Sequence, residues 1–64
     1  MLNMPTDREL TLAEVAASLR VSVDKARDYL SNGDIPAWKV GRQWRVRESD
    51  VEAFKRMQRE KRQK

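Results

Sequence analysis

The chain of 64 residues contains neither cysteine nor histidine. Without cysteine it can form no disulfide and no zinc–thiolate site. Without histidine it lacks the commonest metal ligand and the usual general base at neutral pH. Its two glycines, Gly33 and Gly41, are too few for a glycine-rich loop that cradles phosphate. We therefore expect no catalytic site, no metal and no cofactor.

Long apolar runs are also missing, since the longest covers only residues 15–17. This pattern fits neither a transmembrane helix nor a secretory signal, so no membrane partner is expected. The lack of cysteine is consistent with a reducing cytoplasm. A chain this short buries only roughly 60% of its unfolded surface, which predicts one small domain with a marginal core.

Charge is distributed unevenly along the chain. Residues 1–36 contain four basic and six acidic side chains, whereas residues 37–64 contain ten basic and four acidic ones. The first part thus has a net charge of −2 and the second a net charge of +6. Such asymmetry indicates a polyanionic partner on one side of the molecule.

A first helix is predicted over residues 11–19. Thr11 and Glu14 have the spacing of a capping box, and Leu10 stands where a hydrophobic staple would pack on Val15. Apolar residues then follow at the spacing of one helical face. These residues are Leu12, Val15, Ala16 and Leu19.

A second helix is predicted after a turn at residues 20–21. Ser22 is its expected N-cap, and the Asn-Gly pair at 32–33 is expected to end it because it tolerates a left-handed backbone. Its apolar face is expected to contain Val23, Ala26 and Leu30, with Tyr29 beside them. Two short helices joined by a tight turn form a helix-turn-helix.

Two segments that alternate apolar and basic residues, 38–40 and 44–47, predict a β-hairpin. Opposed residues share a face, so a two-residue loop at 41–42 would mix apolar and charged groups on each face. A three-residue loop at 41–43 instead turns all four apolar side chains inward and leaves an outward face that is basic. We expect this second arrangement, although such loops usually carry glycine last rather than first. Its apolar pairs are Val40 with Trp44 and Trp38 with Val46, and its outward residues are Lys39 and Arg45.

A third helix is predicted to open at residues 48–50, where Ser49 and Glu52 have capping-box spacing. Val51, Phe54 and Met57 are expected to cover the core. Residues 55–64 contain six basic side chains and one acidic one, and either extend this helix or form an irregular end. The expected organisation is a flexible N-terminal arm (1–10), one domain (11–54) and a basic C-terminal tail (55–64).

An ordered set of short motifs runs through residues 12–16, 21–22, 33–36, 39–46 and 49–54, with an Arg27-x-Tyr29 pattern between them. With this set, residues 11–54 resemble the excisionase-type winged helix-turn-helix, a relative of the DNA-binding domain of mercury-resistance-type (MerR) regulators. The resemblance implies a fold that is mainly α with a small β-hairpin. It also implies that the second helix (22–30) enters the major groove, while the wing (39–47) approaches the minor groove or the backbone.

The expected DNA contacts fall into two groups. Arg42, at the wing tip, is placed to enter a narrow minor groove, and the other wing cations to grip phosphates. Lys25 and Arg27 are placed to donate to guanine. The candidates in the second helix are Ser22, Asp24, Lys25, Arg27 and Asp28. The candidates in the wing are Lys39, Arg42, Gln43, Arg45 and Arg47.

Other interpretations of these residues stay open. The wing cations are also compatible with a solvated strand face. Asp24 and Asp28 either accept from cytosine or pair with Arg27 and Lys25 on the helix surface. Tryptophans beside basic residues stack on bases in some single-strand binders, but a domain this small needs Trp38 and Trp44 as core.

The resemblance predicts a phage or mobile-element excisionase (a recombination directionality factor). Such a protein binds and bends attachment-site DNA and promotes excision by an integrase. Expected partners are double-stranded DNA, an integrase or other recombinase, and further copies of the chain that bind cooperatively on DNA. A cytoplasmic location at the nucleoid of a bacterium follows.

Two alternatives remain: a minimal MerR-like transcription regulator, and a protein-interaction adaptor that binds no nucleic acid. Because the sequence contains no counterpart of the long dimerising helix and effector domain of MerR regulators, no small-molecule effector is expected.

Overall fold

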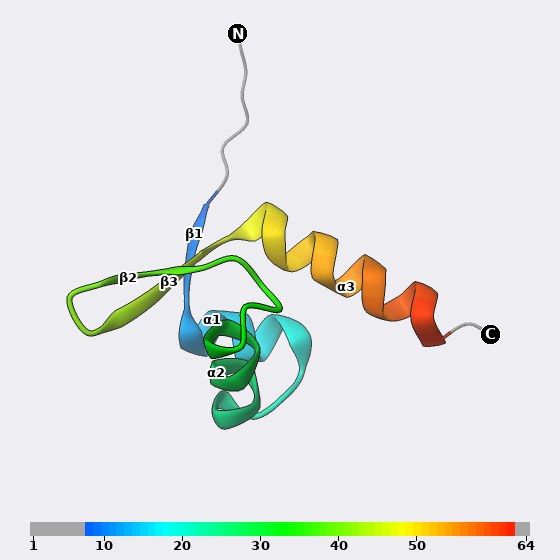
Figure 1. Cartoon of the computed structure of the whole chain (residues 1–64), viewed down its shortest axis with the longest axis horizontal. Coiled ribbons are helices and arrows are strands. Elements are labelled where there is room, and N and C mark those ends of the chain that lie inside the picture. The colour runs from blue at the N-terminus through cyan, green and yellow to red at the C-terminus, as the bar shows by residue number, and fades with distance from the viewer. Residues whose placement is uncertain (1–7, 63–64) are drawn as a thin grey trace, which may run out of the picture.

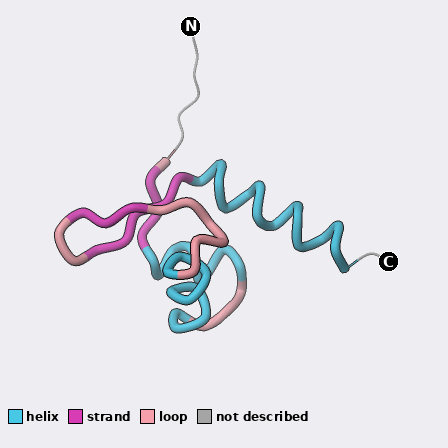
Figure 2. Tube along the Cα trace, viewed as in Figure 1, coloured by secondary structure: helices cyan, strands magenta, loops and turns pink. Residues whose placement is uncertain are grey.

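The computed structural model describes residues 8–62, which form helices and a three-stranded antiparallel sheet (Figure 1). Figure 2 shows the β-hairpin extending to one side of a helix pair and the last helix extending to the other. The predicted fold class, mainly α with a small β wing, is confirmed. In chain order the elements are β1 (Glu9–Thr11), α1 (Leu12–Leu19), α2 (Val23–Ser31), β2 (Trp38–Val40), β3 (Gln43–Arg47) and α3 (Glu48–Arg62).

Helix α1 begins with the predicted capping box. The Thr11 hydroxyl accepts from the Glu14 backbone N–H (3.2 Å), and the Glu14 carboxylate accepts from the Thr11 N–H (2.8 Å). The helix ends at Arg20, which adopts a left-handed conformation (φ 61°) and donates its N–H to the Ala17 carbonyl (3.2 Å). This residue supplies the tight turn between the two helices.

Helix α2 also begins at its predicted cap, because the Ser22 hydroxyl accepts from the Lys25 N–H at 3.0 Å. Gly33, with φ at +84°, reverses the chain after the helix, as the Asn-Gly pair predicted. Ala26 and Leu30 are buried, but Val23 is 43% exposed. The assignment of Val23 to the core face is wrong, since the first turn of α2 lies at the edge of the packed surface.

The core lies where α1, α2, the base of β3 and the start of α3 meet. Val51 and Phe54 close it from α3 as predicted, whereas Met57 is 48% exposed and does not. Figure 1 shows the reason, because the C-terminal half of α3 projects away from the other elements. The buried residues are Leu10, Val15, Ala16, Ala26, Leu30, Ile35, Val46, Val51 and Phe54.

The chain is ordered on both sides of the segment expected to form the domain. Glu9–Thr11 is strand β1, paired with β3 so that Leu10 lies opposite Val46, and both residues are buried. The expectation of an arm up to residue 10 is therefore wrong for its last two residues, while residues 1–7 lie outside the described part. At the other end α3 continues to Arg62, so residues 55–62 extend the helix, and residues 63–64 are not described.

The register of the hairpin differs from the prediction. Val40 pairs with Gln43, so the loop has two residues, and Trp38 pairs with Arg45 rather than with Val46. Val40 is 52% exposed, and Trp38 lies outside the core cluster, which Trp44 does border. The four apolar residues are not all buried, because the hairpin extends beyond the core and only the base of the hairpin is covered.

The glycine position explains this register. Gly41 has φ of +64° and comes first in the two-residue loop. A two-residue hairpin turn of type II′ takes glycine at that position, and its backbone twist matches that of the strands. Turn geometry therefore outweighed the segregation of apolar and charged faces in an exposed hairpin.

Candidate DNA-binding surface

The observed register places cations on both faces of the wing. Lys39 lies opposite Trp44, on the face of the sheet that also carries buried Val46, and its Nζ sits 5.0 Å from the centre of the Trp44 ring. Arg47 lies on the other face, with its guanidinium 5.8 Å from the centre of the Trp38 ring. The expectation of one outward face holding Lys39 together with Arg45 is wrong, because the two residues alternate across the sheet.

A hollow of about 490 Å³ opens between the wing, the start of α1 and one side of α2. Four of its lining residues are basic, and none is acidic. Arg27 comes from α2, Lys39 and Arg45 come from the two wing strands, and Arg42 comes from the turn between them. The lining residues are Thr11, Leu12, Ala13, Val23, Arg27, Ser31, Lys39, Arg42, Gln43, Trp44 and Arg45.

The α2 wall of this hollow is a single stripe of the helix. Val23, Arg27 and Ser31 are spaced four residues apart and therefore lie one above another. Sequence reasoning selected Arg27 but missed Val23 and Ser31. Their spacing from Arg27 was the available signal, and Val23 was assigned to the core instead.

Arg27 is held by a neighbouring carboxylate. Its Nη1 lies 2.8 Å from the Asp24 carboxylate, and both side chains are exposed. An exposed pair of this kind contributes only about 0–1 kcal/mol, so the guanidinium can leave it for a phosphate or a base. The surface-pair interpretation thus holds for Asp24 and Arg27.

Lys25 and Asp28 do not form the corresponding pair in residues 8–62. Lys25 instead places its Nζ 5.3 Å from the centre of the Tyr29 ring. Asp28 is exposed, and its backbone carbonyl accepts from the Asn32 N–H at 2.9 Å. A lysine resting on an aromatic face stays solvated and remains accessible to an anion.

The structure gathers half of the ten predicted site residues around the hollow. These five residues are Arg27, Lys39, Arg42, Gln43 and Arg45. The other five lie outside its lining: Ser22, Asp24, Lys25, Asp28 and Arg47. Ser22 is engaged as the N-cap of α2, where backbone N–H groups of the first turn remain available to an anion.

Glu14 adjoins this surface through the α1 cap. The hydrogen bond from the Thr11 backbone N–H holds the pKa of Glu14 below its ordinary value, and the positive charges of Arg8 and Arg45 act in the same direction. Arg8 lies 3.6 Å from the carboxylate. Glu14 therefore stays ionised beside the strands that carry the wing cations.

Comparison with known proteins places this geometry in a family. Residues 9–59 match the family described as helix-turn-helix domain. Over 45 residues the chain is 44% identical to Uncharacterized protein YvgK of Bacillus subtilis (strain 168), a match that covers 70% of this chain and 15% of that relative. The chain thus spans a small part of the longer relative's length.

No solved structure gives a significant match. Within residues 8–62 no helix has the length and apolar character needed to cross a membrane. Because the family match covers well over half of its residues, the chain belongs to the helix-turn-helix domain family, which indicates that it binds DNA.

Proposed function

We propose that the chain binds duplex DNA with α2 in the major groove and with the β2–β3 wing on the adjoining backbone and minor groove. The observation that supports this most directly is the basic hollow. Arg27 of α2 and Lys39 and Arg42 of the wing line one concavity, and among residues 8–62 no acidic side chain belongs to its lining. Duplex DNA has phosphates on both sides of each groove, so it offers contacts to the cations of α2 and to those of the wing at the same time.

The proposed roles follow the position of each side chain. Arg42, exposed at the wing tip, enters the minor groove, where a narrow groove strengthens the negative potential. Lys39, Arg45 and Arg47 contact phosphates and fix the docking position. Arg27, released from Asp24, reads a guanine edge in the major groove.

Lys25 and Ser22 complete the α2 contacts. Lys25 is exposed at the N-terminal turn of α2 and donates to a base or a phosphate. Ser22 keeps its capping hydrogen bond, while the backbone N–H groups of the same turn face a phosphate.

The test is a titration of labelled duplex DNA at several salt concentrations, followed by fluorescence anisotropy. Log affinity should fall linearly with log salt, by about 0.9 per phosphate neutralised. Arg42→Ala should weaken binding at least about fivefold on every sequence and reduce the slope by about one. Arg56→Ala removes the same charge from an exposed position of α3 and is the matched control. Equal losses for the two variants would contradict the docking proposed here.

Within DNA binding, we propose the role of an excisionase at the attachment site of a mobile element. The motifs shared with excisionase-type winged helices support this role. Cooperative binding to tandem sites and a shift of an integrase reaction toward excision are the expected results. An integrase reaction unchanged by saturating protein would oppose the excisionase role and would leave DNA binding intact.

A transcription regulator is the second candidate. The motifs of residues 11–54 support it, because they also resemble the DNA-binding domain of MerR regulators. Promoter binding and a change in transcript level without a recombinase would favour this candidate over the excisionase.

A further inference from the structure

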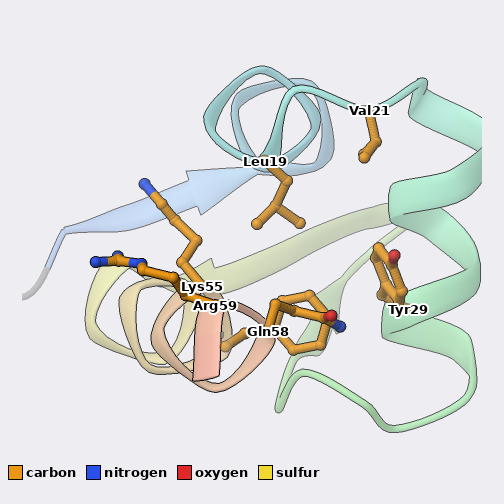
Figure 3. A pocket seen from close by; sticks show the side chains of 7 residues that line it. Leu19, Val21, Tyr29, Lys55, Gln58 and Arg59 are labelled. Atoms are coloured by element: carbon orange, nitrogen blue, oxygen red, sulfur yellow. The ribbon is translucent and has the colours of Figure 1, made fainter. Parts of the chain in front are cut away.

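A second hollow lies away from the wing, between the end of α1, the helix-turn-helix turn, α2 and α3 (Figure 3). Its volume is about 530 Å³. Figure 1 shows that the wing and α3 extend from opposite sides of the helix pair, so this hollow lies away from the wing cations, although α2 borders it as well. We name it the α3 groove, and its lining residues are Leu19, Val21, Tyr29, Phe54, Lys55, Gln58 and Arg59.

The α3 groove has an apolar part and a basic end. Leu19, Val21 and Tyr29 are half-buried side chains packed on the core, and the Tyr29 ring lies 4.8 Å from that of buried Phe54, centre to centre. In Figure 3 the charged ends of Lys55 and Arg59 lie together at the end away from Tyr29. An apolar floor beside a basic rim suits an amphipathic segment that carries carboxylates.

The two cations of the groove differ in their partners. Lys55 donates to the Ser18 hydroxyl and to the Glu52 carboxylate, each at 3.2 Å, and so ties α3 to α1. Arg59 is exposed, and among residues 8–62 it forms no ion pair. Its guanidinium presents a planar donor set that matches a carboxylate in two hydrogen bonds.

We propose that the α3 groove is a docking site for an acidic amphipathic helix of a partner protein. Apolar side chains of that helix lie on Leu19, Val21 and Tyr29, and its carboxylates pair with Arg59. Charge complementarity favours such a partner over a second copy of this chain, whose own α3 is basic where it borders the groove. The proposal goes beyond DNA binding, because it assigns a separate surface to a protein partner.

The probe is a synthetic amphipathic peptide of about 16 residues, just above the length below which isolated helices are marginal in water. It carries leucine at helical spacing on one face and glutamate elsewhere, and a control peptide carries lysine in place of glutamate. Backbone NMR of the full chain should show shifts centred on Leu19, Val21, Tyr29 and Gln58 with the acidic peptide only. Shifts spread over the wing, or equal shifts with the lysine peptide, would overturn the proposal.

Two charge reversals make the test specific. Arg59→Glu should weaken binding of the acidic peptide about fivefold, because a pair is replaced by a repulsion. Arg56→Glu makes the same change in net charge on the same helix outside the groove lining, and should retain binding. Equal losses of peptide affinity in both variants would show that the peptide binds by non-specific charge attraction, which would overturn the proposal. Groove signals that move on dilution of the peptide-free protein would assign the groove to a second copy and also overturn the proposal.

Failure of this proposal and failure of DNA binding are distinguishable. Peptide binding is measured without DNA, and the same two variants are titrated with duplex DNA. Both reversals should lower DNA affinity by the same factor, since they change the net charge equally. A chain that binds the acidic peptide at the α3 groove but not DNA would retain this inference and refute the proposed function.

Discussion

The helix pair and the wing are stabilised in different ways. Helices α1 and α2 are closed by side-chain caps at Thr11 and Ser22, and each buries apolar residues in the core. The β2–β3 wing fully buries only Val46 and otherwise rests on contacts such as Lys39 over Trp44. The free energy of folding is therefore concentrated in the core that the helix pair forms with the base of β3 and the start of α3. The wing cations proposed to contact DNA project from a part that contributes little to folding.

The sharpest test of this difference compares two apolar truncations. Ile35, which follows α2, is fully buried, and Ile35→Ala should lower the free energy of unfolding by about 2–5 kcal/mol. Val40→Ala, in the exposed wing, should change it by no more than about 0.5 kcal/mol. Urea denaturation followed by circular dichroism measures both. A loss of stability in Val40→Ala equal to that in Ile35→Ala would show that the wing belongs to the core.

The two tryptophans test the register inside the wing. Trp44 packs against the core and Trp38 does not, so Trp44→Ala should cost about 2 kcal/mol, roughly half the cost of truncating a fully buried tryptophan. Trp38→Ala should cost less than about 1 kcal/mol. Thermal unfolding of the two variants gives the comparison. Similar losses would favour the three-residue loop, in which both indoles face inward.

A substitution in the Asp24–Arg27 pair tests how much α2 contributes to the proposed DNA contact beside the wing. Asp24→Ala frees Arg27 and removes a negative charge from α2, so affinity for duplex DNA should rise about threefold, with little effect on stability. Anisotropy titrations on several sequences measure the change, with Asp34→Ala, in the loop after α2, as the charge control. Loss of affinity confined to certain sequences would instead assign Asp24 to a cytosine contact.

The smallest expected effect is a pH dependence at the α1 cap. Because the pKa of Glu14 is lowered by folding from its ordinary value of 4.5, its ionised form stabilises the native state above that pH. This contribution is lost as the pH falls through the lowered pKa. Glu14→Gln should therefore flatten the decline of Tm between neutral pH and about pH 3. Glu60→Gln, at an exposed site on α3, is the control for the change in net charge. If the Tm of Glu14→Gln fell with pH as steeply as that of the wild type, Glu14 would not be the group responsible for the decline.

The sequence predicted the features that depend on near neighbours in the chain better than those that depend on contacts between distant segments. The caps at Thr11 and Ser22, the turn at Arg20 and the stop at Gly33 were confirmed, because each depends on residues within about four positions. Helix α3 begins at Glu48, one residue before the Ser49 that was expected to open its capping box. Strand β1 was missed because it has three residues and pairs with β3, more than thirty positions along the chain. The alternation of polar and apolar residues in β1 is too short to predict a strand from the sequence.

The candidate site shows the same difference between local and long-range features. The sequence identified the cations, and the family match supports the kind of partner they serve. It misjudged their arrangement because a shift of one residue in register moves every side chain to the other face. That shift placed Lys39 on the same face of the sheet as Trp44, and both residues line the hollow together with Arg27.

The sequence by itself determined the helix ends, the helix-turn-helix and the basic character of the second half. Local hydrogen bonds and local charge set these features. Only the tertiary structure decided which face each wing residue occupies, that β1 completes the sheet, and that the basic half of α3 borders an apolar groove. These features depend on which distant surfaces are covered, and burial is a property of the assembled fold rather than of any segment.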